Sequence, residues 1–209
     1  MSVAQDFLAL AIHKNVLNFG EFTLKSGRVS PYFFNAGLFD DGHSLLKLGH
    51  HYAQTIRHSG IEFDMLYGPA YKGIPLATTI AVAWYELYQE NLPVAFNRKE
   101  RKDHGEGGQL IGAPVRGRVL IVDDVVSAGT SVRESIELIS QHDASVVGIA
   151  VALDRQEKGA GELSAMQELQ QQYGLQTISI ANLSSLFEYL KDDQETLKKV
   201  QSYRDQYGV

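Results

Sequence analysis

Short apolar segments alternate with amphipathic segments between about residue 44 and residue 190, and this order constrains the fold more than any other feature. The apolar segments show no polar alternation, which is typical of strands buried on both faces; they cover 64–67, 94–96, 119–122, 146–153 and 177–180. Helical spacing of apolar residues predicts helices over about 44–56, 74–88 and 130–141, the first capped by Ser44. Such alternation forms right-handed βαβ units. The sequence therefore predicts an α/β fold with a central parallel sheet of about five strands flanked by helices.

The ends of the chain differ from this alternating core, which we expect over about residues 44–190. A helix that carries Phe7, Leu10 and Leu17 is predicted first, followed by two short strands around 22–24 and 32–35. These elements form a small N-terminal hood, about residues 1–40, over the carboxyl edge of the sheet. The segment 193–207 has mixed charge and helical propensity, which predicts a surface helix. One domain over residues 1–209 accounts for the whole chain.

The charge and the residue types exclude several kinds of protein. A net charge of −6 disfavours a surface for nucleic acid, because neutralising a phosphate backbone needs many Lys and Arg on one face. Any anion site must be local, and the segment 98–104 places four fixed positive charges together. The absence of cysteine excludes thiol nucleophiles and suits a cytoplasmic protein. No apolar run approaches the roughly 18 residues of a membrane span, so we expect no membrane partner.

The strongest functional signal is an apolar strand that ends in two acids, Asp123 and Asp124, before a loop of small residues enters a helix. Ligands bind at such strand ends in open α/β sheets. The loop, Ser127 to Ser131, offers backbone N–H groups and hydroxyls at a helix N-terminus, which suits a phosphate. It lacks the lysine of a Walker loop, and the two carboxylates suit the vicinal hydroxyls of a ribose. Without these neighbours, two adjacent acids would indicate only a turn.

This stretch resembles the motif of type I phosphoribosyltransferases that binds phosphoribosyl diphosphate (PRPP). Three further stretches resemble the orotate phosphoribosyltransferase family: Leu24 to Asn35, Gly68 to Ala77, and Phe96 to Gly108. With Asp154 to Glu157, the resemblance covers nearly the whole chain in order. It implies the type I phosphoribosyltransferase fold and the transfer of the phosphoribosyl group from PRPP to orotate, which yields orotidine 5′-monophosphate and diphosphate in pyrimidine (UMP) biosynthesis.

The resemblance also implies how PRPP is bound. The turn after the strand at 64–67 would hold the diphosphate, although the turn alone could be a plain connection with a solvated lysine. The segment 98–108 would be a mobile lid. Its composition alone would equally suit a charged surface that is merely exposed to solvent. Its Arg98, Lys102 and His104 would serve the neighbouring subunit, while Lys99 serves its own. The implied PRPP-binding residues are Lys25, Tyr71, Lys72, Arg98, Lys99, Lys102, His104, Asp123, Asp124, Val125, Val126, Ser127, Ala128, Gly129, Thr130 and Ser131. Four of these are expected to be catalytic: Lys102, His104, Asp123 and Asp124.

Orotate, an anionic pyrimidine, needs an aromatic wall and a cation. Phe33 and Phe34 offer the wall, although aromatic residues in a strand often belong to the core. Arg155 follows an apolar strand, and its planar fork suits a carboxylate. The resemblance implies that these three residues and Ser127 bind orotate. Serine at position 127 departs from the threonine common in the family, but it keeps the hydroxyl.

Magnesium and a homodimer with shared active sites complete what the resemblance implies. Mg²⁺ commonly keeps waters and substrate phosphates in its shell, so we expect no protein metal ligand. Two alternatives stay open at this point. One is a purine or uracil phosphoribosyltransferase, which the PRPP motif permits but which would leave Arg155 without a carboxylate. The other is a non-catalytic regulator that senses PRPP, which the lack of a separate basic segment for DNA disfavours.

Overall fold

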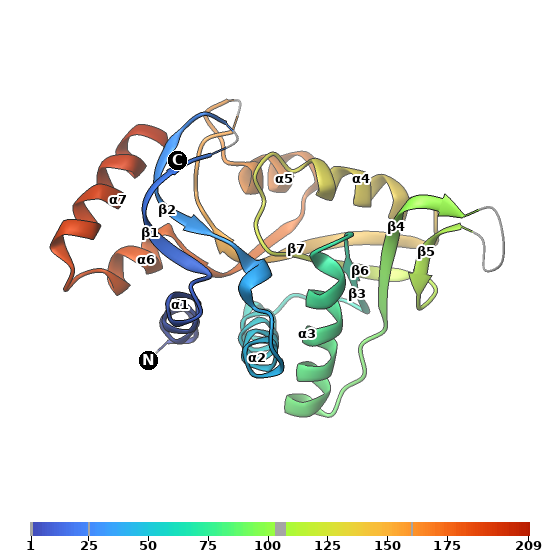
Figure 1. Ribbon diagram of the computed structural model, residues 1–209. Helices are drawn as coiled ribbons and strands as arrows, with labels where there is room; N and C mark the ends of the chain where they lie inside the picture. The colour runs from blue at the N-terminus through green and yellow to red at the C-terminus, as the bar shows by residue number, and fades with distance from the viewer. Residues whose placement is uncertain (1, 25, 103–107, 160) are drawn as a thin grey trace.

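The computed structural model describes residues 2–24, 26–102, 108–159 and 161–209 (Figure 1). The described chain contains a six-stranded sheet in the order β5-β4-β3-β6-β7-β8. Its strands are β3 (Met65–Gly68), β4 (Val94–Lys102), β5 (Gly108–Gly112), β6 (Gly117–Asp123), β7 (Ala144–Asp154) and β8 (Gln176–Asn182). All neighbouring pairs are parallel except β4 and β5. The predicted parallel sheet of about five strands is therefore confirmed, with one antiparallel strand added at its edge.

Helices cover both faces of this sheet (Figure 1). On one face lie α1 (Val3–His13), α2 (Gly42–Ser59) and α3 (Gly73–Tyr88), and on the other lie α4 (Thr130–Ile139) and α5 (Ala165–Tyr173). The buried strands supply apolar side chains to both layers, as the continuous apolar runs predicted. In β6, for example, Leu120 and Val122 belong to the first core, whereas Val119 and Ile121 belong to the second.

The hood is a two-stranded antiparallel sheet of β1 (Leu17–Thr23) and β2 (Val29–Phe34), followed by a short 3₁₀ turn, η1 (Ala36–Leu38). Two helices after β8 adjoin it, α6 (Leu183–Tyr189) and α7 (Gln194–Tyr207). Helix α7 buries Val200 and Tyr203 and packs near β2, since the rings of Tyr32 and Tyr203 lie 6.2 Å apart. The segment 193–207 is thus a packed part of the hood and not only a surface helix.

Three boundary predictions are wrong, each for a local reason. The first helix ends at His13, because Asn15 adopts a positive φ of 55°, and Leu17 begins β1 instead. Asp41 caps α2, and Ser44 completes the capping box from the third helical position. The segment Arg98–Lys102 continues strand β4 and does not form a loop, so only the centre of the predicted 98–108 lid lies outside the described residues.

Candidate functional site

The carboxyl ends of the parallel strands bring the predicted PRPP motifs to one edge of the sheet. Strand β6 lies between β3 and β7, so the acid pair after β6 is flanked by the loops that follow both neighbours. The Nζ atom of Lys72, in the loop after β3, lies 2.6 Å from Oδ2 of Asp124. The loop at residues 68–73, which is predicted to hold the diphosphate, and the acid pair are about 50 residues apart in the chain but lie together at this edge.

The two acids are held firmly but in different ways. Asp124 is almost fully buried, and its carbonyl accepts N–H bonds from Ala152 and Leu153 of β7. The N–H of Asp124 donates to Oδ1 of Asp123 at 2.9 Å. The hydroxyl of Tyr52, in α2, donates to the carbonyl of Asp123 at 2.7 Å. The backbone of the pair is therefore fixed by the neighbouring strand β7 and by helix α2 on one face of the sheet.

Burial and, to a lesser extent, the charge of Asp124 together raise the pKa of Asp123 to about 7, although Lys72 acts in the opposite direction. Because the folded protein binds this proton more tightly than the unfolded chain, the carboxyl group costs no stability at low pH. Its cost grows as the pH rises from about 4 through about 7. Asp123, which is predicted to bind a ribose hydroxyl, therefore lowers the stability of the folded protein as the pH rises through this range.

Asp123→Asn should consequently raise the melting temperature at about pH 8, with a gain of about 1–2 kcal/mol, and should raise it less at about pH 4.5. The same variant should lower kcat/KM roughly ten- to a hundredfold, because it weakens a charge-assisted contact with the ribose. Thermal unfolding at both pH values and steady-state kinetics check the two effects. Wild-type kinetics would refute the ribose assignment, and a pH-independent stability change would refute the effect of burial.

The loop from Val125 to Ser131 presents an open helix end, as a phosphate site requires. Gly129 is the residue before α4 and has a φ of 72°, and no side chain caps this end of the helix. The hydroxyl-bearing residues Thr130 and Ser131 are exposed there, as are Ser127 and Ala128, while Val125 and Val126 are half-buried. Arg133 steadies the loop, because its Nη1 donates to the carbonyl of Ala128 at 2.6 Å. The first amides of α4 and its positive dipole end thus face the site.

The diphosphate loop, residues 68–73, depends on two glycines in close contact. A Cβ atom on Gly68 would lie 2.0 Å from the carbonyl oxygen of Gly73. The N–H of Ala70 donates to Oδ1 of Asn97 at 2.9 Å, which ties the loop to β4. Tyr71 is 68% exposed, and Nζ of Lys99 lies 4.8 Å from the centre of its ring. Lys99 of β4 therefore lies against Tyr71 of this loop, whereas Lys72 of the same loop contacts Asp124.

Gly68→Ala is expected to destabilise the protein by about 2–3 kcal/mol, because the contact that it creates is with backbone atoms that cannot rotate away. The displaced loop should also raise the KM for PRPP. Gly42→Ala is the matched control, since a Cβ atom there meets nothing within 4 Å. Thermal unfolding of both variants decides the matter. Equal melting temperatures would mean that the loop accommodates a side chain.

The structure separates the two residues of the predicted aromatic wall. Phe33 is 40% exposed, and its ring stacks on Phe22 with the centroids 5.5 Å apart. Phe34 is 7% exposed, and its ring lies in the core 6.3 Å from that of Phe7. The wall role of the Phe34 ring is therefore wrong, because neighbouring residues of a strand point to opposite faces. The contact of the exposed Phe33 with orotate stays a prediction.

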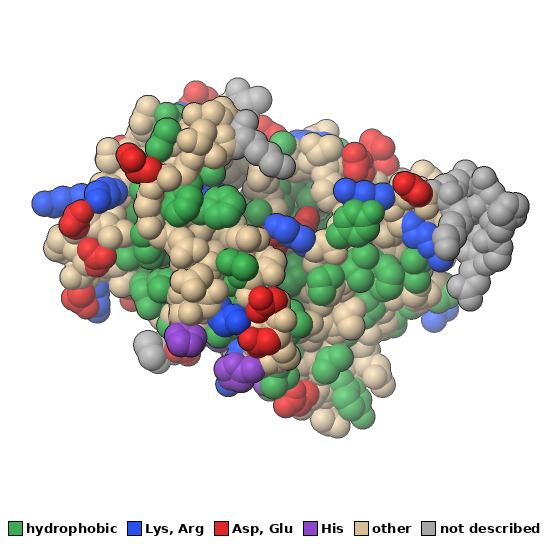
Figure 2. All heavy atoms as spheres, in the orientation of Figure 1, with side chains coloured by type: hydrophobic (Ala, Val, Ile, Leu, Met, Phe, Trp, Pro, Cys, Tyr) green, Lys and Arg blue, Asp and Glu red, His purple; other side chains and the backbone are tan. Residues whose placement is uncertain are grey.

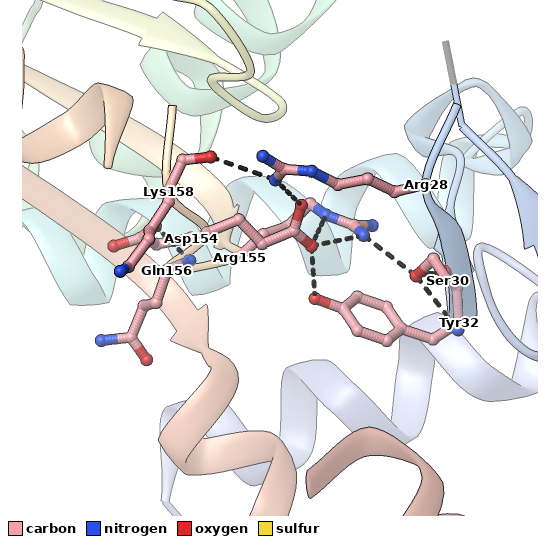
Figure 3. A network of polar contacts seen from close by, with 8 residues as sticks. Arg28, Ser30, Tyr32, Asp154, Arg155, Gln156 and Lys158 are labelled. Atoms are coloured by element: carbon pink, nitrogen blue, oxygen red, sulfur yellow. Dashed lines mark hydrogen bonds and ion pairs between the residues drawn. The ribbon is translucent and has the colours of Figure 1, made fainter. Parts of the chain in front are cut away.

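Arg155 lies just past the end of β7 and points toward the hood, where it meets β2 (Figure 3). Its Nη2 donates to the hydroxyl oxygen of Ser30 at 3.0 Å, and its guanidinium lies 4.3 Å from the ring centre of Tyr32. Glu157 accepts from its Nε at 2.8 Å. Arg155 is thus a largely buried cation held between the sheet and the hood, next to the predicted base site.

Several predicted residues receive no geometric test. Lys25 and His104 lie outside the described residues, as does the side chain of Lys102. Arg98 lies in β4, and its Nη1 donates to the carbonyl of Gly108 at 3.4 Å, which joins the two strands of the β4–β5 arm. Sequence reasoning missed Ser30, Asn97 and Glu157, each of which contacts a predicted site residue. All three lie within quoted segments, Ser30 in Leu24 to Asn35, Asn97 in Phe96 to Gly108 and Glu157 in Asp154 to Glu157, but nothing in the sequence alone singled them out.

Among the described residues, no group of three or more His, Asp or Glu side chains is placed to hold a metal ion. None of the helices in the described ranges is both long and apolar enough to cross a membrane.

Comparison with known proteins gives consistent matches over the whole chain. The model of the phosphoribosyl transferase domain matches residues 38–171. A relative from Thioalkalivibrio sulfidiphilus, named orotate phosphoribosyltransferase, is 58% identical over 207 residues, which is 98% of this chain and 97% of the relative. A relative of the same name from Pseudomonas aeruginosa is 57% identical over 208 residues, 98% of each chain. The crystal structure of orotate phosphoribosyltransferase from Francisella tularensis has a TM-score of 0.90 and 41% identity, and covers 98% of this chain and 100% of its own.

Proposed function

The chain belongs to the orotate phosphoribosyltransferase family, and we propose that it works as a magnesium-dependent homodimer with shared active sites. Its reaction is the transfer of the 5-phosphoribosyl group from PRPP to orotate in pyrimidine biosynthesis. A purine or uracil enzyme and a non-catalytic sensor of PRPP are thereby set aside. The observation that carries the residue assignments is the 2.6 Å contact between Lys72 and Asp124, because it joins the diphosphate loop to the acid pair.

The proposed roles follow from the positions of the residues at the carboxyl edge of the sheet. The amides and hydroxyls at the start of α4 bind the 5′-phosphate, and Asp123 and Asp124 accept hydrogen bonds from the ribose hydroxyls. When PRPP enters, Lys72 exchanges its contact with Asp124 for the diphosphate. An orotate ring nitrogen attacks the anomeric carbon as the bond from that carbon to diphosphate breaks, so diphosphate leaves with the bonding electrons and the proton of the nitrogen is released to solvent. The residues contribute charge and position, and none acts as a covalent nucleophile.

Magnesium fits this site through the substrate. The carboxylates of Asp123 and Asp124 would lie beside an ion that keeps water and substrate oxygens in its shell, as Mg²⁺ commonly does. When bound, Mg²⁺ would neutralise charge on the departing diphosphate. The protein's own cations, Lys72 and Lys99, would bind the diphosphate from the side of the loop.

Chelation of Mg²⁺ by EDTA should therefore lower the rate of orotate consumption at least about tenfold, and added Mg²⁺ should restore it. The assay follows orotate absorbance in the presence of PRPP, with adenine, hypoxanthine and uracil as competing bases. The competitors should leave the orotate rate nearly unchanged. Full activity in EDTA would contradict the dependence on magnesium.

The surface of α3 supports the homodimer. One side of this helix is exposed at helical spacing, at Pro75, Thr78, Val82 and Tyr85, and the exposed Tyr71 lies two residues before the helix begins. Val82 is 60% and Tyr85 is 49% exposed, and Figure 2 shows hydrophobic side chains gathered on this face. An apolar stripe that begins at a diphosphate-binding residue suits contact with a second copy of the chain.

The β4–β5 arm supports sharing of the sites. It projects from the edge of the sheet beyond the helices (Figure 1), and it carries Arg98 and Lys99. We assign Arg98 of this arm to the partner's site, and Lys99, which lies beside Tyr71, to the site of its own chain. A cytoplasmic location is likewise a proposal, supported by a sequence without cysteine.

A further inference from the structure

Glu157 holds Arg155 by one edge of its guanidinium group. Its Oε1 accepts from Nε of Arg155 at 2.8 Å and lies 2.6 Å from Nη2. The second N–H of Nη2 is directed to Ser30, as Figure 3 shows. A guanidinium has five N–H groups, and these contacts use three of them. The two N–H groups of Nη1 have no recorded partner among the described residues.

The contact between Arg155 and Glu157 is largely buried, so breaking it would cost free energy. The side chains of Arg155 and Glu157 are each only 14% exposed. The ring of Tyr32 covers the guanidinium of Arg155, and the hydroxyl of Tyr32 lies 3.4 Å from Oε1 of Glu157. Nη1 of Arg28 lies 3.8 Å from the other oxygen of Glu157. Arg28 and Arg155 are cations and Glu157 is an anion, so this cluster has one excess positive charge that an anionic ligand can neutralise.

The backbone that bears Glu157 is fixed independently of its side chain. The N–H of Gln156 donates to Oδ1 of Asp154 at 2.9 Å, and Gln156 has a positive φ of 48°. The end of α7 then pairs with this segment, since the N–H of Lys158 donates to the carbonyl of Tyr207 at 2.8 Å. Glu157 is thus placed by the chain and not by its contact with Arg155. It can act as a fixed point against which a long, flexible side chain is oriented.

We propose that Glu157 is a positioning residue for orotate, which holds the Nε–Nη2 edge of Arg155 so that Nη1 is presented to the substrate carboxylate. This inference rests on the proposed role of Arg155. An unrestrained arginine must lose rotamer freedom each time that it binds a carboxylate. With Glu157 in place, that loss has already occurred in the folded protein. Orotate therefore binds to a guanidinium group whose plane is already fixed in the free protein.

A double-mutant cycle tests the proposal on the full-length protein, with Glu157→Gln, Arg155→Gln and the combined variant. Glu157→Gln keeps the shape of the side chain and loses its charge. It should raise the orotate KM about tenfold and leave kcat and the PRPP KM within about twofold. In the Arg155→Gln background the same change should alter the orotate KM by less than about twofold, because no fork remains to be positioned. Glu162→Gln is the matched control, since Glu162 pairs with Lys158 on the surface.

The outcomes separate this inference from the role of Arg155 itself. A wild-type orotate KM in Arg155→Gln would overturn the role of Arg155. If Arg155→Gln raises that KM while Glu157→Gln does not, or if Glu157→Gln has the same effect in both backgrounds, Glu157 does not act through Arg155. A rise in both KM values would make Glu157 a structural residue. If Glu157→Gln does not fold, Glu157→Asp replaces it, and its retained charge with a shorter reach should raise the orotate KM about threefold.

Discussion

Replacing Arg155 with leucine is expected to raise the KM for orotate about a hundredfold and to leave the KM for PRPP within about twofold. Only orotate brings a carboxylate to this arginine, and the site around it is largely buried, so water replaces the lost contact poorly. Leucine also removes the nearer of the two cations beside Glu157, so the cluster of Arg28, Arg155 and Glu157 loses the excess positive charge that would attract the substrate carboxylate. Steady-state kinetics with each substrate varied in turn measure both constants.

Arg118→Leu serves as the control for this experiment. Arg118 lies at the amino end of β6, on the opposite edge of the sheet, where it pairs with Glu62 and Asp64. Its loss should leave both KM values unchanged. Equal increases of the two constants in Arg155→Leu, with a lowered melting temperature, would mean that Arg155 has a structural role. An unchanged orotate KM would mean that the carboxylate is bound elsewhere.

A mixture of two inactive variants is expected to recover about a quarter of the wild-type activity if the sites are shared. Asp124→Asn disables a site through its own chain, and Lys102→Ala disables a site through the partner's lid. Each homodimer should be nearly inactive. In a mixed dimer, the site built on the Lys102→Ala chain receives an intact lid from its partner. The other site collects both defects.

The expected fraction follows from random exchange. At equal concentrations about half of the dimers are mixed and half of their sites work. The purified variants are mixed, allowed to exchange and assayed for orotate consumption, with exchange followed by mass-tagged chains. If mixed dimers form and the activity stays at the sum of the two variants, each lid serves its own site. A chain that remains a monomer in solution would exclude the shared site altogether.

The parts of the fold that could be predicted are those determined by residues close together in the sequence. The strand at 119–122 has a continuous apolar run because it is buried on both faces, and the loop to Ser131 follows it directly in the chain. Strand β5 was not predicted, because two glycines bracket only three other residues in Gly108–Gly112. Helix α5 was not predicted either, although Ser164 and Gln167 form a capping box that the sequence contains.

The base site was harder to predict because its contacts span the chain. Arg28 and Ser30 meet the segment after β7 across about 125 intervening residues, and no local pattern encodes such a contact. The error at Phe34 was different in kind. The alternation of side chains along a strand already implies that Phe33 and Phe34 cannot both face the ligand. Burial in the structure then decides which of the two lies in the core.

The central position of β6 also determines the order in which a refolding chain can assemble. Met65 in β3 pairs with Val119 in β6, so the middle of the sheet closes only after a loop of about 50 residues has been brought together. Helices form within about a microsecond, whereas parallel pairing across such a separation is slow. Until β6 is inserted, β3 has one open edge and the acid pair has no lysine beside it. Helical content should therefore return before the catalytic groups meet, and regained activity reports the last stage of folding.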